Sequence, residues 1–255
     1  MADVDANQGR PSGPRAAARR ALVSLLMERG EIRDPRVLRA VAEVPRERFV
    51  PEALGPSAYC DVALPIDCAQ TISQPYVVAL MTQLVGAGPG RRILEVGTGS
   101  GYQAAVLAAT GAEVFSVEII EELAQRAAER LGSLHYKVHS RQGDGRQGWP
   151  EEAPFDGIVV TAAPRQVPAS LVAQLAPGGR LVVPVGGAGE QELWRLTRVG
   201  DGPEISWERI TAVRFVPLTG QVGASFMADA GSGTMRHGLD RDRRSGAAPG
   251  ARHRQ

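Results

Sequence analysis

A run of glycines between a short apolar strand and a helix is the feature that most constrains how this chain folds. The segment 93–96 predicts a strand, residues 101–109 predict a helix, and residues 95–102 across the junction read Glu-Val-Gly-Thr-Gly-Ser-Gly-Tyr. Glycine allows a tight turn and lets the backbone approach a ligand closely. Glu118 ends the next predicted strand, where a carboxylate can accept hydrogen bonds from both hydroxyls of a ribose. The pattern therefore predicts a site for a cofactor that carries a nucleoside.

The spacing of the glycines indicates the class of cofactor. A dinucleotide fingerprint has the form G-x-G-x-x-G, whereas here Tyr102 stands where its third glycine would be. No Gly-Lys-Ser/Thr follows, so the loop is not a Walker A loop. With Glu95 before it, the loop resembles motif I of S-adenosylmethionine-dependent methyltransferases. The alternatives are a nicotinamide oxidoreductase on a similar sheet, a binding module without turnover, and a glycine-rich turn without a ligand.

Strands and helices alternate after Arg92, which predicts an α/β fold. Alternation of this kind is typical of βαβ units, in which helices cover both faces of a parallel sheet. Two later strands predict an antiparallel hairpin that closes the sheet. The expected strands are 93–96, 114–117, 136–140, 157–160, 180–185, 192–199 and 205–218, and the expected helices are 101–109, 120–131 and 168–175.

Three helices are expected ahead of the sheet, at 16–29, 35–43 and 74–85, with a stretch rich in proline and glycine at 45–66. Gly30 is a natural residue to end the first helix. Asp34 is the expected N-cap of the second, with proline at its first position. Ser73 is the expected N-cap of the third helix.

Composition bounds the remaining possibilities. The chain has 255 residues, with 29 Lys+Arg against 28 Asp+Glu, a balance that argues against a protein whose main partner is nucleic acid. No apolar run approaches the roughly 18 residues of a membrane span, and no secretory signal is visible. We therefore expect a cytoplasmic monomer with residues 1–15 disordered, a helical cap and substrate loop over 16–90, a catalytic domain over 91–220 and a disordered tail over 221–255. The arginines of that tail are interpreted as solvated, with a weak anionic tether as the alternative.

Cysteine and histidine do not predict a metal centre. Cys60 and Cys68 fit no common zinc spacing and are expected to be plain thiols. His135 and His139 fall in or beside a predicted strand and are expected on the surface.

Upstream of the glycine loop, residues 64–75 read Leu-Pro-Ile-Asp-Cys-Ala-Gln-Thr-Ile-Ser-Gln-Pro. At this segment the chain resembles the protein-L-isoaspartate (D-aspartate) O-methyltransferase family, and Gln-Thr-Ile-Ser-Gln-Pro is its most distinctive element. Further matches occur in family order over about 32–219, at 44–50, 64–66, 95–102, 143–145, 153–156, 161–163, 177–179, 181–186 and 213–218.

The resemblance implies a class I S-adenosylmethionine-dependent methyltransferase fold with an N-terminal helical cap. It implies methyl transfer from S-adenosylmethionine to the free α-carboxylate of isoaspartyl residues in damaged proteins or peptides. The ester then collapses to a succinimide, whose hydrolysis partly restores aspartate. Ser73 matches the family's active-site serine, and the peptide is expected to lie extended beside it and the strand end at 213–219.

Two groups of further residues are expected around Ser73. The cofactor-binding residues are Glu95, Gly97, Thr98, Gly99, Ser100, Gly101, Glu118, Ile119, Asp144, Gly145 and Thr161. The substrate-binding residues are Ile66, Asp67, Ala69, Gln70, Thr71, Ile72, Arg214, Val216 and Thr219. Asp144 is expected to accept a hydrogen bond from the adenine amino group, and a plain Gly-Asp-Gly turn is the alternative.

The chain departs from the family pattern at Asp67 and Ala69, where family members usually have glycine. Asp67 adds a negative charge near a site that must receive a carboxylate. This departure leaves a second function open, the methylation of an aspartate side chain in one dedicated ribosomal peptide to give an aspartimide or isoaspartate.

Overall fold

The alternating segments after Arg92 form the expected parallel sheet. This computed structural model describes residues 14–187, 189–220, 225–226 and 234–235. The central sheet has the order β12-β10-β9-β8-β6-β3-β4-β5, and its strands from β8 to β5 run parallel. These parallel strands are β3 (Arg92–Val96), β4 (Glu113–Glu118), β5 (Val138–Gln142), β6 (Phe155–Val160) and β8 (Leu175–Gly186).

The antiparallel hairpin is present at the other side of the sheet. Strand β9 (Gln191–Arg198) pairs antiparallel with both β8 and β10 (Ile205–Val213), and the short β12 (Thr234–Met235) follows at the edge. The fold class predicted from the sequence is thereby confirmed.

The last strand of the hairpin is shorter than expected, since β10 ends at Val213 and not at Leu218. After Val213 the backbone hydrogen bonds between β9 and β10 give way to bonds with the side chain of Gln191. Its Oε1 accepts from Phe215 N at 2.6 Å and its Nε2 donates to Phe215 O at 3.1 Å. The chain then leaves the sheet, and Ala163 N donates to Val216 O at 2.8 Å. Residues 214–219 therefore cross over the carboxyl ends of the parallel strands.

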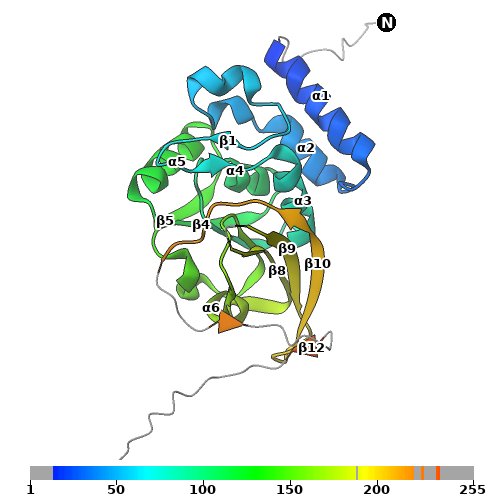
Figure 1. Cartoon of the computed structure of the whole chain (residues 1–255), viewed down its shortest axis with the longest axis vertical. Coiled ribbons are helices and arrows are strands. Elements are labelled where there is room, and N and C mark those ends of the chain that lie inside the picture. The colour runs from blue at the N-terminus through cyan, green and yellow to red at the C-terminus, as the bar shows by residue number, and fades with distance from the viewer. Residues whose placement is uncertain (1–13, 188, 221–224, 227–233, 236–255) are drawn as a thin grey trace, which may run out of the picture.

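Helices cover both faces of the sheet (Figure 1). One face is covered by α3 (Pro75–Val85), α4 (Tyr102–Ala109) and α5 (Glu121–Ser133), whose buried side chains share a core with α1 (Pro14–Arg29) and α2 (Pro35–Glu43). The other face carries α6 (Ala169–Ala173). Short 3-10 helices complete the chain: η1 (Arg46–Arg48), η2 (Glu52–Ser57), η3 (Gly145–Gln147) and η4 (Pro150–Glu152).

The predicted end of the first helix and the predicted start of the second are confirmed. Gly30 follows α1 with φ of 71°, the left-handed conformation that favours glycine. The side chain of Asp34 accepts a hydrogen bond from Arg36 N at 2.9 Å, and Pro35 is the first residue of α2.

A small hairpin that the sequence analysis did not predict precedes α3. Strand β1 (Leu64–Pro65) pairs antiparallel with β2 (Thr71–Ile72), so that residues 66–70 form its tip. Strands of two residues carry no periodicity, which is why the pattern gave no signal. The hairpin carries most of the predicted substrate residues.

The expected disordered ends lie mostly outside the described residues. Of the predicted tail, β11 (Ser225–Phe226) pairs with β7 (Val167–Pro168), and β12 pairs with β10. Over the part of the chain that the structure describes, no helix is both long and apolar enough to cross a bilayer.

Candidate active site

The loop between β3 and α4 has a backbone that glycine adopts without strain. Gly97, Gly99 and Gly101 have φ of 94°, 52° and 88°, all in the left-handed region. A β-carbon on Gly97 would lie 2.5 Å from Thr161 Oγ1, and one on Gly101 would lie 3.3 Å from Leu131 Cγ. The loop therefore packs its backbone against the residue after β6 and against α5.

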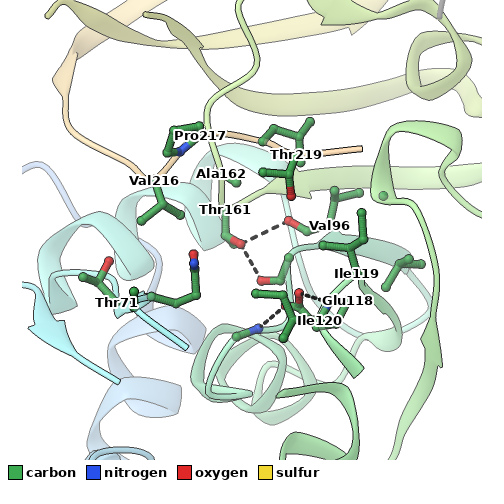
Figure 2. A pocket seen from close by; sticks show the side chains of 17 residues that line it. Thr71, Val96, Glu118, Ile119, Ile120, Thr161, Ala162, Val216, Pro217 and Thr219 are labelled. Carbon is green, nitrogen blue, oxygen red and sulfur yellow. Dashed lines mark hydrogen bonds between the residues drawn. The ribbon is translucent and has the colours of Figure 1, made fainter. Parts of the chain in front are cut away.

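Glu118 holds this loop from the end of β4. Its carboxylate is buried, and Oε2 accepts from Gly99 N at 2.8 Å while Oε1 accepts from Ile120 N at 3.0 Å (Figure 2). An ionised carboxylate has about four acceptor positions. The two oxygens are thus fixed in place and keep capacity for hydroxyl donors of a ligand.

A cavity of about 220 Å³ lies between the glycine loop, Glu118 and the crossing segment 216–219 (Figure 2). Six of the predicted cofactor residues line it: Gly97, Gly99, Glu118, Ile119, Gly145 and Thr161. Five of the predicted substrate residues line it as well: Ala69, Gln70, Thr71, Val216 and Thr219. The hairpin tip and the crossing segment therefore form part of the wall of this cavity.

Six residues of this cavity were missed from the sequence: Val96, Val117, Ile120, Ala162, Pro217 and Leu218. The first four lie next to motif residues or at the carboxyl ends of the parallel strands, and this position in the sequence could have predicted them. Pro217 and Leu218 reach the cavity only because β10 ends early, which no local pattern indicates.

Glu95 lies beneath the loop and is fully buried. It accepts a hydrogen bond from Ser116 Oγ, which is also 2.5 Å from Thr98 Oγ1. Burial raises the pKa of Glu95 to about 8, the Ser116 hydrogen bond opposes this shift, and the charge of Glu118 adds to it. Glu95 is therefore mainly a neutral acid at pH 7 and supports the loop from below.

The other predicted residues of this group flank the cavity. Ser100 is buried, and its carbonyl accepts from Arg130 Nη1 at 2.7 Å. Asp144 caps η3, because its Oδ1 accepts from Arg146 N at 2.9 Å. This is the turn chemistry expected of Gly-Asp-Gly, and it holds Asp144 next to Gly145 of the cavity wall.

Ser73 lies in the wall of a second groove, which adjoins this cavity. This groove has a volume of about 570 Å³, and its walls come from the β2–α3 segment and the end of β10, with Thr71, Ser73, Arg214 and Val216 among them. Thr71 and Val216 also line the 220 Å³ cavity beside the glycine loop. A pocket of about 30 Å³ has both Ser73 and Gly97 in its wall. The serine is therefore next to the glycine loop on one side and the groove on the other.

The prediction that Ser73 caps α3 is wrong. Pro75 takes the first helical position, so the N-cap is Gln74, which makes no side-chain capping bond. Asp61 supplies the cap instead: its Oδ1 accepts from Tyr76 N and its Oδ2 from Gln74 Nε2, at 2.8 and 2.9 Å. Within the described residues the Ser73 hydroxyl makes no hydrogen bond, so it is available to a substrate.

Two predicted substrate residues of the hairpin tip, Ile66 and Asp67, line neither the cavity nor the groove. Asp67 forms an ion pair with Arg126 of α5 at 2.6 Å, and Ile66 and Asp67 line a separate pocket of about 90 Å³. Ala69 has φ of 54°, a conformation that suits the glycine usual in the resembling family. Ile72 is buried and Arg214 is exposed.

None of Cys60, Cys68, His135 and His139 lines the cavity or the groove. Cys60 and Cys68 are free thiols, and His135 and His139 are both exposed, as predicted. The described part of the chain contains no group of three or more acidic, cysteine or histidine residues arranged to hold a metal ion.

Residues 17–223 match the profile of the family described as protein-L-isoaspartate(D-aspartate) O-methyltransferase. The chain is 58% identical over 195 residues to protein-L-isoaspartate O-methyltransferase 1 of Anaeromyxobacter sp. (strain Fw109-5), which covers 75% of this chain and 92% of the relative. It is 59% identical over 191 residues to the protein-L-isoaspartate O-methyltransferase of Anaeromyxobacter dehalogenans (strain 2CP-C), which covers 74% and 91%.

The fold agrees with this relationship. It is similar, with a TM-score of 0.67 and 26% identity, to the crystal structure of a Plasmodium falciparum protein assigned to the same family, in complex with S-adenosyl-L-homocysteine. That similarity covers 79% of this chain and 98% of the other. Since the family profile matches most of the chain and two relatives at 58% and 59% identity are covered almost completely, the chain belongs to the protein-L-isoaspartate(D-aspartate) O-methyltransferase family.

Proposed function

We propose that this chain methylates the free α-carboxylate of L-isoaspartyl residues in damaged proteins and peptides, and that Ser73 orients this carboxylate. The observation that supports the proposal most is the position of Ser73 between the glycine loop and the groove. The methyl ester then reacts with the following backbone nitrogen, which expels methanol and closes a succinimide. Hydrolysis of the succinimide returns part of the material to normal aspartate.

The residues around the glycine loop fit S-adenosylmethionine. Gly97 and Gly99 present bare backbone to the cavity, and the Glu118 carboxylate is fixed where it can accept from ribose hydroxyls. Ile119, Ile120 and Leu218 offer apolar surface in the same cavity. When bound, the cofactor supplies a methyl group that its sulfonium already activates.

The protein's task in this reaction is positioning. An α-carboxylate has a pKa of about 3.5 and is ionised at neutral pH, so its methylation needs no general base. The Ser73 hydroxyl donates to one carboxylate oxygen and aims the other at the methyl group. Thr71 and Val216, which line both cavities, flank the place where carboxylate and methyl group meet and help to exclude water from it. Alignment and exclusion of water account for the rate enhancement.

Because no base titrates in this mechanism, kcat is expected to be independent of pH between about pH 6 and 8. The measurement is the initial rate on an isoaspartyl peptide at saturating S-adenosylmethionine, in buffers of matched ionic strength. A kcat that rises tenfold per pH unit over that range would show that a catalytic base is present.

Replacing Ser73 with alanine is expected to lower kcat by about 10- to 100-fold, because the carboxylate loses its orienting donor. The affinity for S-adenosylhomocysteine, measured by calorimetry, is expected to stay unchanged. Ser206→Ala on β10 is the matched control, since this serine is exposed and lies outside the walls of both cavities. An equal loss of cofactor affinity in the Ser73→Ala variant would contradict the orienting role.

We also infer that the protein works as a monomer in the cytoplasm. Two unpaired cysteines suit a reducing compartment. The large apolar side chains exposed in the described chain are few: Leu25, Met27, Val62, Ile119 and Val199. Light scattering during size-exclusion chromatography measures the oligomeric state.

A further inference from the structure

Arg46 is a charged side chain at the centre of the cap, and none of its surface is exposed. Its Nε donates to Ala58 O and its Nη2 donates to Ser73 O, both at 2.8 Å. Burial lowers the pKa of Arg46, and nearby tyrosines and Asp61 oppose that shift. Burying a guanidinium is costly unless its donors and charge are matched. Two of its nitrogens are matched by carbonyls in this way, whereas Nη1 is buried without a hydrogen-bond partner among the described residues.

The bond to Ser73 satisfies a carbonyl that α3 does not use. The first backbone bond of the helix runs from Val78 N to Gln74 O, one residue after Ser73. Pro75 has no N–H to donate, and Tyr76 N is bonded to Asp61. The backbone at Ser73 is therefore held from outside the helix, by Arg46 at its carbonyl and by Asp61 at the following residues.

Arg46 also contacts the segment that carries the glycine loop. Its guanidinium carbon lies 4.7 Å from the centre of the Tyr102 ring, within range of a cation–π interaction. Tyr102 is the first residue of α4, directly after Gly101, and its ring packs edge-on against Phe49 at 5.5 Å. One rigid guanidinium thus touches the cap, the Ser73 segment and the start of the glycine-loop helix.

We propose that Arg46 is a positioning residue of the methyl transfer, which fixes the Ser73 segment relative to the glycine loop so that carboxylate and cofactor meet in line. Lysine is not equivalent, because its compact ammonium lacks the rigid planar fork whose Nε and Nη2 reach the two carbonyls while the guanidinium lies over the Tyr102 ring. This inference rests on the proposed function, since it acts through Ser73.

The test is a double-mutant cycle with Arg46→Lys and Ser73→Ala. In the wild-type background, Arg46→Lys is expected to lower kcat by about 10-fold or more, with an unchanged affinity for S-adenosylhomocysteine. In the Ser73→Ala background, the same change is expected to lower kcat less than about 2-fold, because the group that it positions is gone. Rates are divided by the sites counted in a S-adenosylhomocysteine titration, so an unfolded fraction does not enter.

Arg48→Lys, on the same 3-10 helix but exposed, is the matched control and is expected to leave kcat unchanged. Arg46→Gln repeats the cycle if Arg46→Lys does not fold. Equal losses of kcat in both backgrounds, or no loss in the wild-type background, would overturn the positioning role. A wild-type chain inactive on isoaspartyl peptides would instead overturn the proposed function, so the two failures are distinguishable.

Discussion

Replacing Glu95 with glutamine is expected to stabilise the protein strongly at pH 8 and little at pH 5. The buried carboxyl has a pKa of about 8 in the folded chain, against about 4.3 in an unfolded one. Between these values the native state keeps a proton that the unfolded state releases, so the free energy of unfolding falls as pH rises towards 8. Glutamine resembles the protonated acid and removes this loss, which is on the order of 5 kcal/mol at most.

The measurement is the thermal midpoint of both proteins at pH 5 and pH 8, without ligand. The variant is expected to gain roughly 10 °C on the wild type at pH 8. Glu113→Gln is the control, because Glu113 lies on the neighbouring strand β4 and is exposed. The same difference between variant and wild type at both pH values would contradict the raised pKa.

Replacing Glu118 with alanine is expected to weaken S-adenosylmethionine binding by about 100-fold or more, since two hydrogen bonds to a charged acceptor are lost. The Gly99 amide also loses its partner, which loosens the glycine loop. Isothermal titration calorimetry measures the affinity, and kcat at saturating cofactor is expected to change far less. Glu113→Ala is the control for the loss of a charge from β4. An unchanged affinity would show that Glu118 does not hold the ribose.

The site near the glycine loop could be predicted because its signals are local. Three glycines at a strand end must adopt conformations that side chains resist, and a carboxylate at the next strand end lies beside them in any parallel sheet. The structure brings Gly97, Gly99 and Glu118 together in this way. The resemblance to the family added Ser73, which local chemistry alone assigned to a helix cap.

The remaining features depend on contacts between distant parts of the chain. The cap of α3 comes from Asp61, which accepts a hydrogen bond from the amide of Tyr76, fifteen positions later in the chain. The end of β10 is set by the side chain of Gln191, 24 positions away from Phe215. Asp67, whose negative charge was expected near the carboxylate site, pairs instead with Arg126 of α5. No periodicity or spacing reports such pairings, because tertiary geometry decides them.

The central claim is tested most directly with two matched peptides, one with isoaspartate and one with aspartate at the same position. Each is incubated with S-adenosylmethionine and the pure protein, and the mass of the peptide is followed by liquid chromatography coupled to mass spectrometry. We expect the mass gain of one methyl group, or the succinimide, on the isoaspartyl peptide alone. Reaction with neither peptide while S-adenosylmethionine still binds, or equal reaction with both, would contradict the repair function and favour a dedicated peptide substrate or another client.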